Sequence, residues 1–151
     1  KLPNFVNQFN LFYIMKTDKL KALYIKYGLE KDDVFKHQHY IIITRSGIDK
    51  IQAAASIKVN YEVIKCETNF CVVKAYGHAG ETSIETFGSA LKGTNMRDGN
   101  CNTWYVMEMA EKRAMSRAVL KLTGFYELGV FGEDESEDFK KQNNSAVWKK
   151  Q

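Results

Sequence analysis

The chain has 151 residues, of which 44% are hydrophobic and 26% charged, so it can form one globular domain with its own core. This composition excludes fibrous and low-complexity proteins. The net charge is +4, but residues 133–138 contain five acids, so the first 132 residues carry a net charge of +5. A moderately basic body permits a polyanionic partner without requiring one.

The three cysteines are Cys66, Cys71 and Cys101. Their number is odd and no CxxC pair is present, so neither a disulfide framework nor a cysteine zinc site is indicated. No apolar run approaches the roughly 20 residues that a membrane helix needs. We find no signal-peptide pattern at the first residues. We therefore expect a cytoplasmic protein, in the host cytoplasm if the chain is viral, with no membrane partner.

The first third of the chain predicts helices and a short hairpin. Residues 5–27 have helical apolar spacing, in one or two helices broken near Thr17 and Asp18 and ended by Gly28. Residues 34–43 indicate a short hairpin, or a strand leading into a buried strand. An alanine-rich helix follows Gly47, with Ser46 as its candidate N-cap.

From residue 58 onward the periodicity changes from helical to alternating. Residues 58–67, 69–79 and 82–91 each have strand character, with turns near residues 68–69 and 79–80. Three consecutive antiparallel strands form a β-meander. The sequence therefore predicts an α+β domain in which this meander packs against a long basic helix, with N-terminal helices and a short hairpin before it.

The long helix is predicted from residues 102–129, and its cations fall on one side. At about 100° per residue, Arg113, Arg117 and Lys121 lie within roughly 80° of one another. Beside them runs a row of small residues: Ala110, Ala114 and Ala118. Such a row lets a helix approach a sheet closely, while arginines on its flank reach out to a phosphate chain. The alternative is a solvated basic face on an ordinary packing helix.

The same helix carries a resemblance to a known family. Residues 108–124, EMAEKRAMSRAVLKLTG, resemble an "RMAETRAxxRALRxxxGxG" helix of phage and archaeal proteins. The matching residues are Ala110, Glu111, Arg113, Ala114, Arg117 and Ala118. Lys112 stands where the pattern usually has threonine. Over residues 33–131 the arrangement is similar to the single-strand annealing recombinases, the group that includes RecT and Redβ of phages.

This resemblance implies a function as well as a fold. It implies a β-β-β-α core in which a basic groove between sheet and helix holds the backbone of single-stranded DNA, with the bases turned out for pairing. It also implies homo-oligomeric rings or filaments. On this basis the expected function is sequence-tolerant strand binding and annealing in phage-type recombination, repair or replication, with no catalysis and no cofactor. A recombination nuclease or a replication protein is a candidate partner.

Candidate DNA contacts are cations and aromatic residues, because single-strand binders grip phosphates and stack bases. They are Lys36, Lys74, Tyr76, His78, Lys92, Arg97, Lys112, Arg113, Arg117 and Lys121. Lys74, Tyr76 and His78 alternate on one strand face. The alternative is that they form an ordinary solvated face. Lys92 and Arg97 belong to a glycine-rich loop before the helix. We expect Trp104, at the helix start, to lie in the core.

Two histidines suggest a separate hypothesis. His37 and His39, two residues apart, would point to one face of an extended strand and supply two metal ligands. No third ligand is fixed by the sequence. There are two alternatives. The histidines and Lys36 contact a phosphate or a base, or the histidines are ordinary hydrogen-bonded residues.

Two other functional classes stay open. A metal-dependent nuclease needs converging carboxylates, and the candidates form no compact spacing motif: Glu62, Glu67, Glu81 and Glu85. A non-catalytic protein-interaction or inhibitor module would use the basic body for protein contacts only.

The end of the chain is predicted to be a charged tail, residues 133–151, following a domain of residues 1–132. Its acidic run is a solvated extension, a segment that occupies a neighbour's basic groove, or a segment that repels non-cognate polyanions. The apolar residues Phe139, Val147 and Trp148 make it a candidate subunit clasp.

Overall fold

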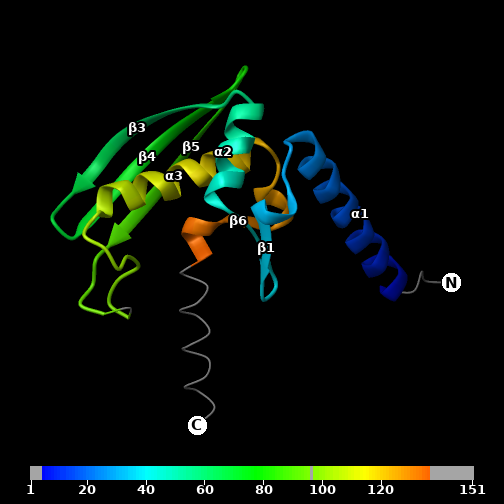
Figure 1. Cartoon of the computed structure of the whole chain (residues 1–151), viewed down its shortest axis with the longest axis horizontal. Helices are drawn as coiled ribbons and strands as arrows, with labels where there is room; N and C mark the ends of the chain where they lie inside the picture. The colour runs from blue at the N-terminus through cyan, green and yellow to red at the C-terminus, as the bar shows by residue number, and fades with distance from the viewer. Residues whose placement is uncertain (1–4, 96, 137–151) are drawn as a thin grey trace, which may run out of the picture.

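The computed structural model describes residues 5–95 and 97–136 and has the expected α+β fold (Figure 1). The helices are α1 (Phe5–Lys26), α2 (Arg45–Ala54) and α3 (Val106–Leu122), and the strands are β1 (Val34–His37), β2 (Tyr40–Ile43), β3 (Lys58–Cys66), β4 (Phe70–Ala79), β5 (Thr82–Leu91) and β6 (Val130–Gly132). Three short 3-10 helices join them: η1 (Lys31–Asp33), η2 (Tyr126–Leu128) and η3 (Glu133–Glu135).

The N-terminal helix α1 is continuous, so the predicted break near Thr17 and Asp18 is wrong. The Thr17 hydroxyl donates to the carbonyl of Tyr13 at 2.9 Å, one turn earlier, and is therefore satisfied inside the helix. Gly28 ends the helix as expected, with a left-handed φ of 66°. The α1 residues that join the core, Leu20, Leu23 and Tyr24, lie in the C-terminal half of the helix, and the N-terminal end extends away from the meander (Figure 1).

The predicted hairpin is confirmed: β1 and β2 pair antiparallel in a small sheet. β6 adds to this sheet, parallel to β2, with Ile41 paired to Val130 far along the chain. It was not predicted, because three residues carry too little periodicity. The following helix α2 is capped by Thr44, whose hydroxyl accepts from the Gly47 amide at 3.1 Å, rather than by Ser46.

The meander is also confirmed. β3, β4 and β5 pair antiparallel in chain order, and Gly80 turns the second hairpin with φ 62°. Alternate residues of β4 are buried, beginning with Cys71 and Val73, because α3 covers that face. The other face of the meander is not covered by a helix (Figure 1).

Small residues bring α3 close to the meander, as the alanine row predicts. A Cβ at Gly88 of β5 would lie 2.2 Å from the carbonyl oxygen of Ala110 and 2.5 Å from the nitrogen of Ala114. The Thr86 hydroxyl donates to the Ala114 carbonyl at 2.6 Å. The helix is shorter than predicted because Gly124, at φ 83°, ends it.

The core has two parts. The larger joins the small sheet, α2, α3 and the C-terminal half of α1, with Phe125 fully buried between Tyr24 and Tyr27. The smaller lies between α3 and the meander and includes Cys71, Cys101 and Val106. Among the described residues, none of the helices combines the length and the apolar character that crossing a bilayer requires.

Candidate nucleic-acid interface

Arg113 of α3 does not reach out from the helix, contrary to the expectation from its position on the basic face. It is 2% exposed. Its Nε donates to the Asp134 carbonyl at 3.2 Å, Nη1 to the Ser89 carbonyl at 2.7 Å and Nη2 to the Asn100 carbonyl at 2.6 Å. All three nitrogens of the guanidinium therefore bind backbone inside the protein, where a phosphate has no access.

Arg117 continues this arrangement one turn later. Its Nη1 donates to the carbonyl of Phe87 at 2.9 Å. Phe87 and Ser89 lie on β5, the edge strand of the meander, and their carbonyls face away from β4. The Leu91 amide faces the same way and donates to Oδ1 of Asn100. The arginines thus complete the hydrogen bonding of a strand edge that would otherwise be exposed.

The spacing of the two arginines fits the spacing of the two carbonyls. Residues i and i+4 of a helix are about 6.0 Å apart along its axis, and residues i and i+2 of a strand are about 6.8 Å apart. Because α3 and β5 run in opposite directions here, Arg113 meets Ser89 and Arg117 meets Phe87. An RxxxR pair can therefore bind a strand edge as readily as a phosphate chain.

The acidic run also binds these arginines. Glu135 is buried, and its Oε1 accepts from Arg117 Nε at 2.6 Å. Asp134 accepts from the Ser116 hydroxyl at 3.1 Å and lies 3.7 Å from Nη1 of Arg45. The described structure thus continues through Ser136, beyond the domain end predicted at Gly132. We name Arg113, Arg117 and Glu135 the β5-edge cluster.

The opposite flank of α3 faces β3 and is not basic. Tyr61 lies on the helix side of β3 and is partly exposed because α3 covers β4 and β5. Burial raises the pKa of Tyr61, the nearby carboxylate of Glu111 raises it further, and Arg45 lowers it. The arginines of α3 therefore lie on the β5 side, and Glu111 is the charged residue of α3 beside Tyr61.

On the uncovered face of the meander, Lys74, Tyr76 and His78 share one side, as predicted. Lys74 Nζ lies 2.8 Å from Glu85 Oε2, and its ammonium is 4.7 Å from the Tyr76 ring centroid and 5.7 Å from that of Phe87. The hydrogen bond to Glu85 raises the pKa of Lys74. This lysine is a fixed, paired cation between two rings, and His78 beside it is exposed.

Trp104 is exposed, so its predicted place in the core is wrong. Its exposed fraction is 65%, and that of Tyr105 beside it is 72%. Val106 and Cys101 fill the core positions at this end of α3, which leaves the two rings outside. The Lys92 ammonium lies 5.4 Å from the Trp104 ring centroid. We name Lys92, Trp104 and Tyr105 the Trp104 surface.

The remaining predicted contacts are dispersed. Lys112 and Lys121 are exposed on α3, and Lys121 lies 5.0 Å from the Tyr126 ring centroid. Arg97 lies in the loop that begins at Lys92, and its amide donates to Asn95 Oδ1 at 2.8 Å. Lys36 is exposed on β1, in the other sheet. The fold brings Lys92 and Trp104 together but does not gather all these cations at one place.

The two histidines do not share a strand face, so the geometric basis of the HxH hypothesis is wrong. His37 ends β1, Gln38 turns the chain with φ 55°, and His39 lies in the turn. Nε2 of His37 is buried without a hydrogen-bond partner. In the described part of the chain, no three residues among its histidines, cysteines and carboxylates are grouped to hold a metal ion.

Compared with known protein families, with curated proteins and with solved structures, the chain matches none. Sequence reasoning missed Glu135 and Arg45 as partners around α3. The signal was present in the acidic run, whose charge is opposite to that of the helix directly before it. The suggested clasp of Phe139, Val147 and Trp148 lies outside the described residues.

Proposed function

We propose that the chain binds single-stranded nucleic acid without sequence preference, through the Trp104 surface, and that it anneals complementary strands. The observation that carries this proposal is the exposed ring of Trp104 with the Lys92 ammonium beside it. Tryptophan is highly buried on average, so a tryptophan with 65% of its surface in water is uncommon. A ring stacks on a base of any sequence, and an adjacent cation binds the phosphate.

The start of α3 supports the same proposal. The helix begins at Val106, directly after the two rings, and its N-cap residue Tyr105 makes no side-chain cap bond. The amide groups of a helix start and the helix dipole favour a phosphate there. Lys112 lies seven residues after Tyr105, on the same side of the helix, and supplies a second cation there, while Glu108 of the first turn lies between them. These contacts involve backbone phosphates and ring faces, which carry little base information.

The test is a titration of the 151-residue chain with fluorescently labelled oligonucleotides, single- and double-stranded, at two salt concentrations. The affinity for mixed-sequence single strands should fall steeply as salt rises, without cleavage, and mixing complementary strands should speed their pairing. Magnesium-dependent cleavage would favour the nuclease alternative. Absence of binding at low salt would leave the protein-interaction alternative.

A second measurement locates the contact. The chain has two tryptophans, so in a Trp148→Phe variant the tryptophan fluorescence comes from Trp104 alone. Stacking of a base on this ring should quench that fluorescence at saturation. Binding with unchanged fluorescence would place the nucleic acid elsewhere on the protein.

A further inference from the structure

Two of the three cysteines lie opposite each other across the β3–β4 hairpin. Cys66 ends β3 and is paired with Cys71 of β4 in the antiparallel ladder. Residues paired in this way project from the same face of a sheet, here the face that α3 covers. Cys71 is buried there in the same core as Val106, whereas Cys66 is exposed on the edge strand β3. The hairpin therefore places one accessible thiol beside one enclosed thiol.

The backbone sets these two residues at the separation that a disulfide needs. The Glu67 amide donates to the Phe70 carbonyl at 2.7 Å, so the next pair, Cys66 and Cys71, is a non-hydrogen-bonded pair. The Cα atoms of such a pair lie about 4.5 Å apart. Disulfides join Cα atoms that are about 4.4–6.8 Å apart. A bond between the two sulfur atoms therefore fits without a shift of the strands.

The surroundings of the two thiols give them different reactivities. Burial raises the pKa of Cys71 to about 11, and a hydrogen bond with the Cys66 thiol and the carboxylate of Glu108 act in the same direction. Near neutral pH Cys71 is therefore a protonated thiol that reacts slowly with a reagent in solution. It can still react with a sulfur atom that is held beside it.

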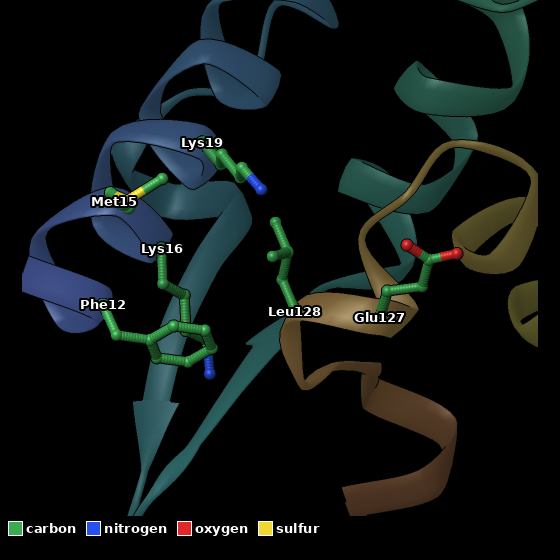
Figure 2. Close-up of a pocket in the computed structure, with 6 residues that line it drawn as sticks. All are labelled: Phe12, Met15, Lys16, Lys19, Glu127 and Leu128. Atoms are coloured by element: carbon green, nitrogen blue, oxygen red, sulfur yellow. The ribbon is translucent and has the colours of Figure 1, made fainter. Parts of the chain in front are cut away.

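A reagent in solution reaches Cys66 before any other thiol. Cys101 is buried, and its Sγ donates to the Thr103 carbonyl at 3.3 Å. The hollow between α1 and η2 contains no cysteine. Figure 2 shows its lining: Phe12, Met15, Lys16, Lys19, Glu127 and Leu128. A small disulfide bound there would meet no thiol, so the reaction begins at the exposed Cys66.

We propose that Cys66 and Cys71 form a reactive dithiol, in which Cys66 reacts with a low-molecular-weight disulfide and Cys71 resolves the adduct. In the first step the Cys66 thiolate attacks one sulfur of glutathione disulfide. A bond between Cys66 and glutathione forms, and the other glutathione leaves as a thiolate that takes up a proton.

The second step closes the bond across the hairpin. Cys71 loses its proton to solvent, and its thiolate attacks the Cys66 sulfur and releases the second glutathione. The two cysteines together lose two electrons and two protons, and glutathione disulfide gains them. Reduced glutathione reverses both steps. An exposed thiol without a resolving neighbour would keep the glutathione instead.

The test is mass spectrometry of the 151-residue chain after treatment with glutathione disulfide. Trypsin cleaves after Lys65 and Lys74, so the peptide of residues 66–74 contains both cysteines. In the unaltered chain this peptide should lose the mass of two hydrogen atoms. In Cys71→Ala it should keep glutathione on Cys66 for roughly tenfold longer or more, because the attack of a neighbouring thiol is intramolecular.

The matched control is Cys101→Ala, which removes a buried thiol from the same core and should behave as the unaltered chain. Three results would overturn the proposal. Cys66 of the unaltered chain could fail to react. It could retain glutathione as long as it does in Cys71→Ala. The disulfide could join Cys66 to Cys101 instead.

Circular dichroism shows whether Cys71→Ala is folded. If it is not, the time course of the unaltered chain decides alone: a disulfide between residues 66 and 71 supports the proposal, and a glutathione adduct that persists contradicts it. None of these results depends on nucleic-acid binding, which the oligonucleotide titration measures separately.

Discussion

The β5-edge cluster and the Trp104 surface are two basic regions on and beside α3, and they use their charges in opposite ways. In the first, the guanidinium groups of Arg113 and Arg117 bind backbone carbonyls and a buried carboxylate. In the second, Lys92 lies beside a ring that is largely in water. Segregated charge on a helix therefore does not distinguish cations that face a ligand from cations that hold the fold together.

The largest expected effect is on stability, from Arg113→Ala. The change leaves three carbonyls inside the protein without their charged donor, so the free energy of unfolding should fall by about 3 kcal/mol or more. Chemical denaturation followed by circular dichroism measures it. Lys112→Ala, the exposed neighbour, is the matched control and should change stability by no more than about 0.5 kcal/mol. An Arg113→Ala protein of normal stability that has lost oligonucleotide binding would show that Arg113 reaches the ligand after all.

Cysteine labelling gives a second measurement on the same variant. Burial raises the pKa of Cys71 to about 11, so at pH 8 this residue is a protonated, unreactive thiol under α3. Cys66 is exposed. Labelling at pH 8 should reach Cys66 at once and Cys71 slowly, and Arg113→Ala should speed the labelling of Cys71 by loosening α3.

The next effect tests how closely α3 approaches β5. In Gly88→Ala the new methyl group would meet the backbone of Ala110 and Ala114, which cannot move as a side-chain end can. We expect a loss of about 1–3 kcal/mol in the free energy of unfolding. Ser83→Ala on the exposed start of the same strand is the control. Equal stability of the two variants would mean that the helix does not lie as close as the structure places it.

On the Trp104 surface the expected effect is on binding. Trp104→Ala should weaken single-strand binding by about 1–3 kcal/mol, the value of one stacked base. Stability should change little because the ring is mostly in water. Phe35→Ala, an exposed aromatic on the other sheet, is the control. A fall in stability without a fall in affinity would contradict the proposed contrast between the two regions.

The smallest expected effect concerns a single phosphate contact. Lys112→Gln should weaken single-strand binding slightly and equally for all sequences, and should reduce the salt dependence by about one released counterion. The affinity at several salt concentrations measures both. Lys36→Gln on β1 provides the comparison, because it lies on the other sheet. If Lys36→Gln has the larger effect, the nucleic acid runs over the small sheet instead.

Periodicity and turn residues determined much of the fold. The alternation of residues 58–91 and the turn at Gly80 were sufficient for the meander, and the alanine row predicted the close approach of α3. These features are local, because a strand or a helix face is encoded within a few residues. The continuous helix across Thr17, the cap at Thr44 and the strand β6 were not predicted, because each depends on a single hydrogen bond or a distant partner.

The candidate site was decided by the tertiary structure. The sequence shows that Arg113, Arg117 and Lys121 share a helix face, but a helix face has no fixed neighbour until the sheet is in place. The fold then placed the edge of β5 beside Arg113 and Arg117 and brought Glu135 into contact with Arg117. It also left Trp104 outside, because Val106 filled the core position near it. Residue type and spacing thus determine which residues share one face of a helix or strand. Only packing between distant segments decides whether that face binds the protein itself or remains open to a partner.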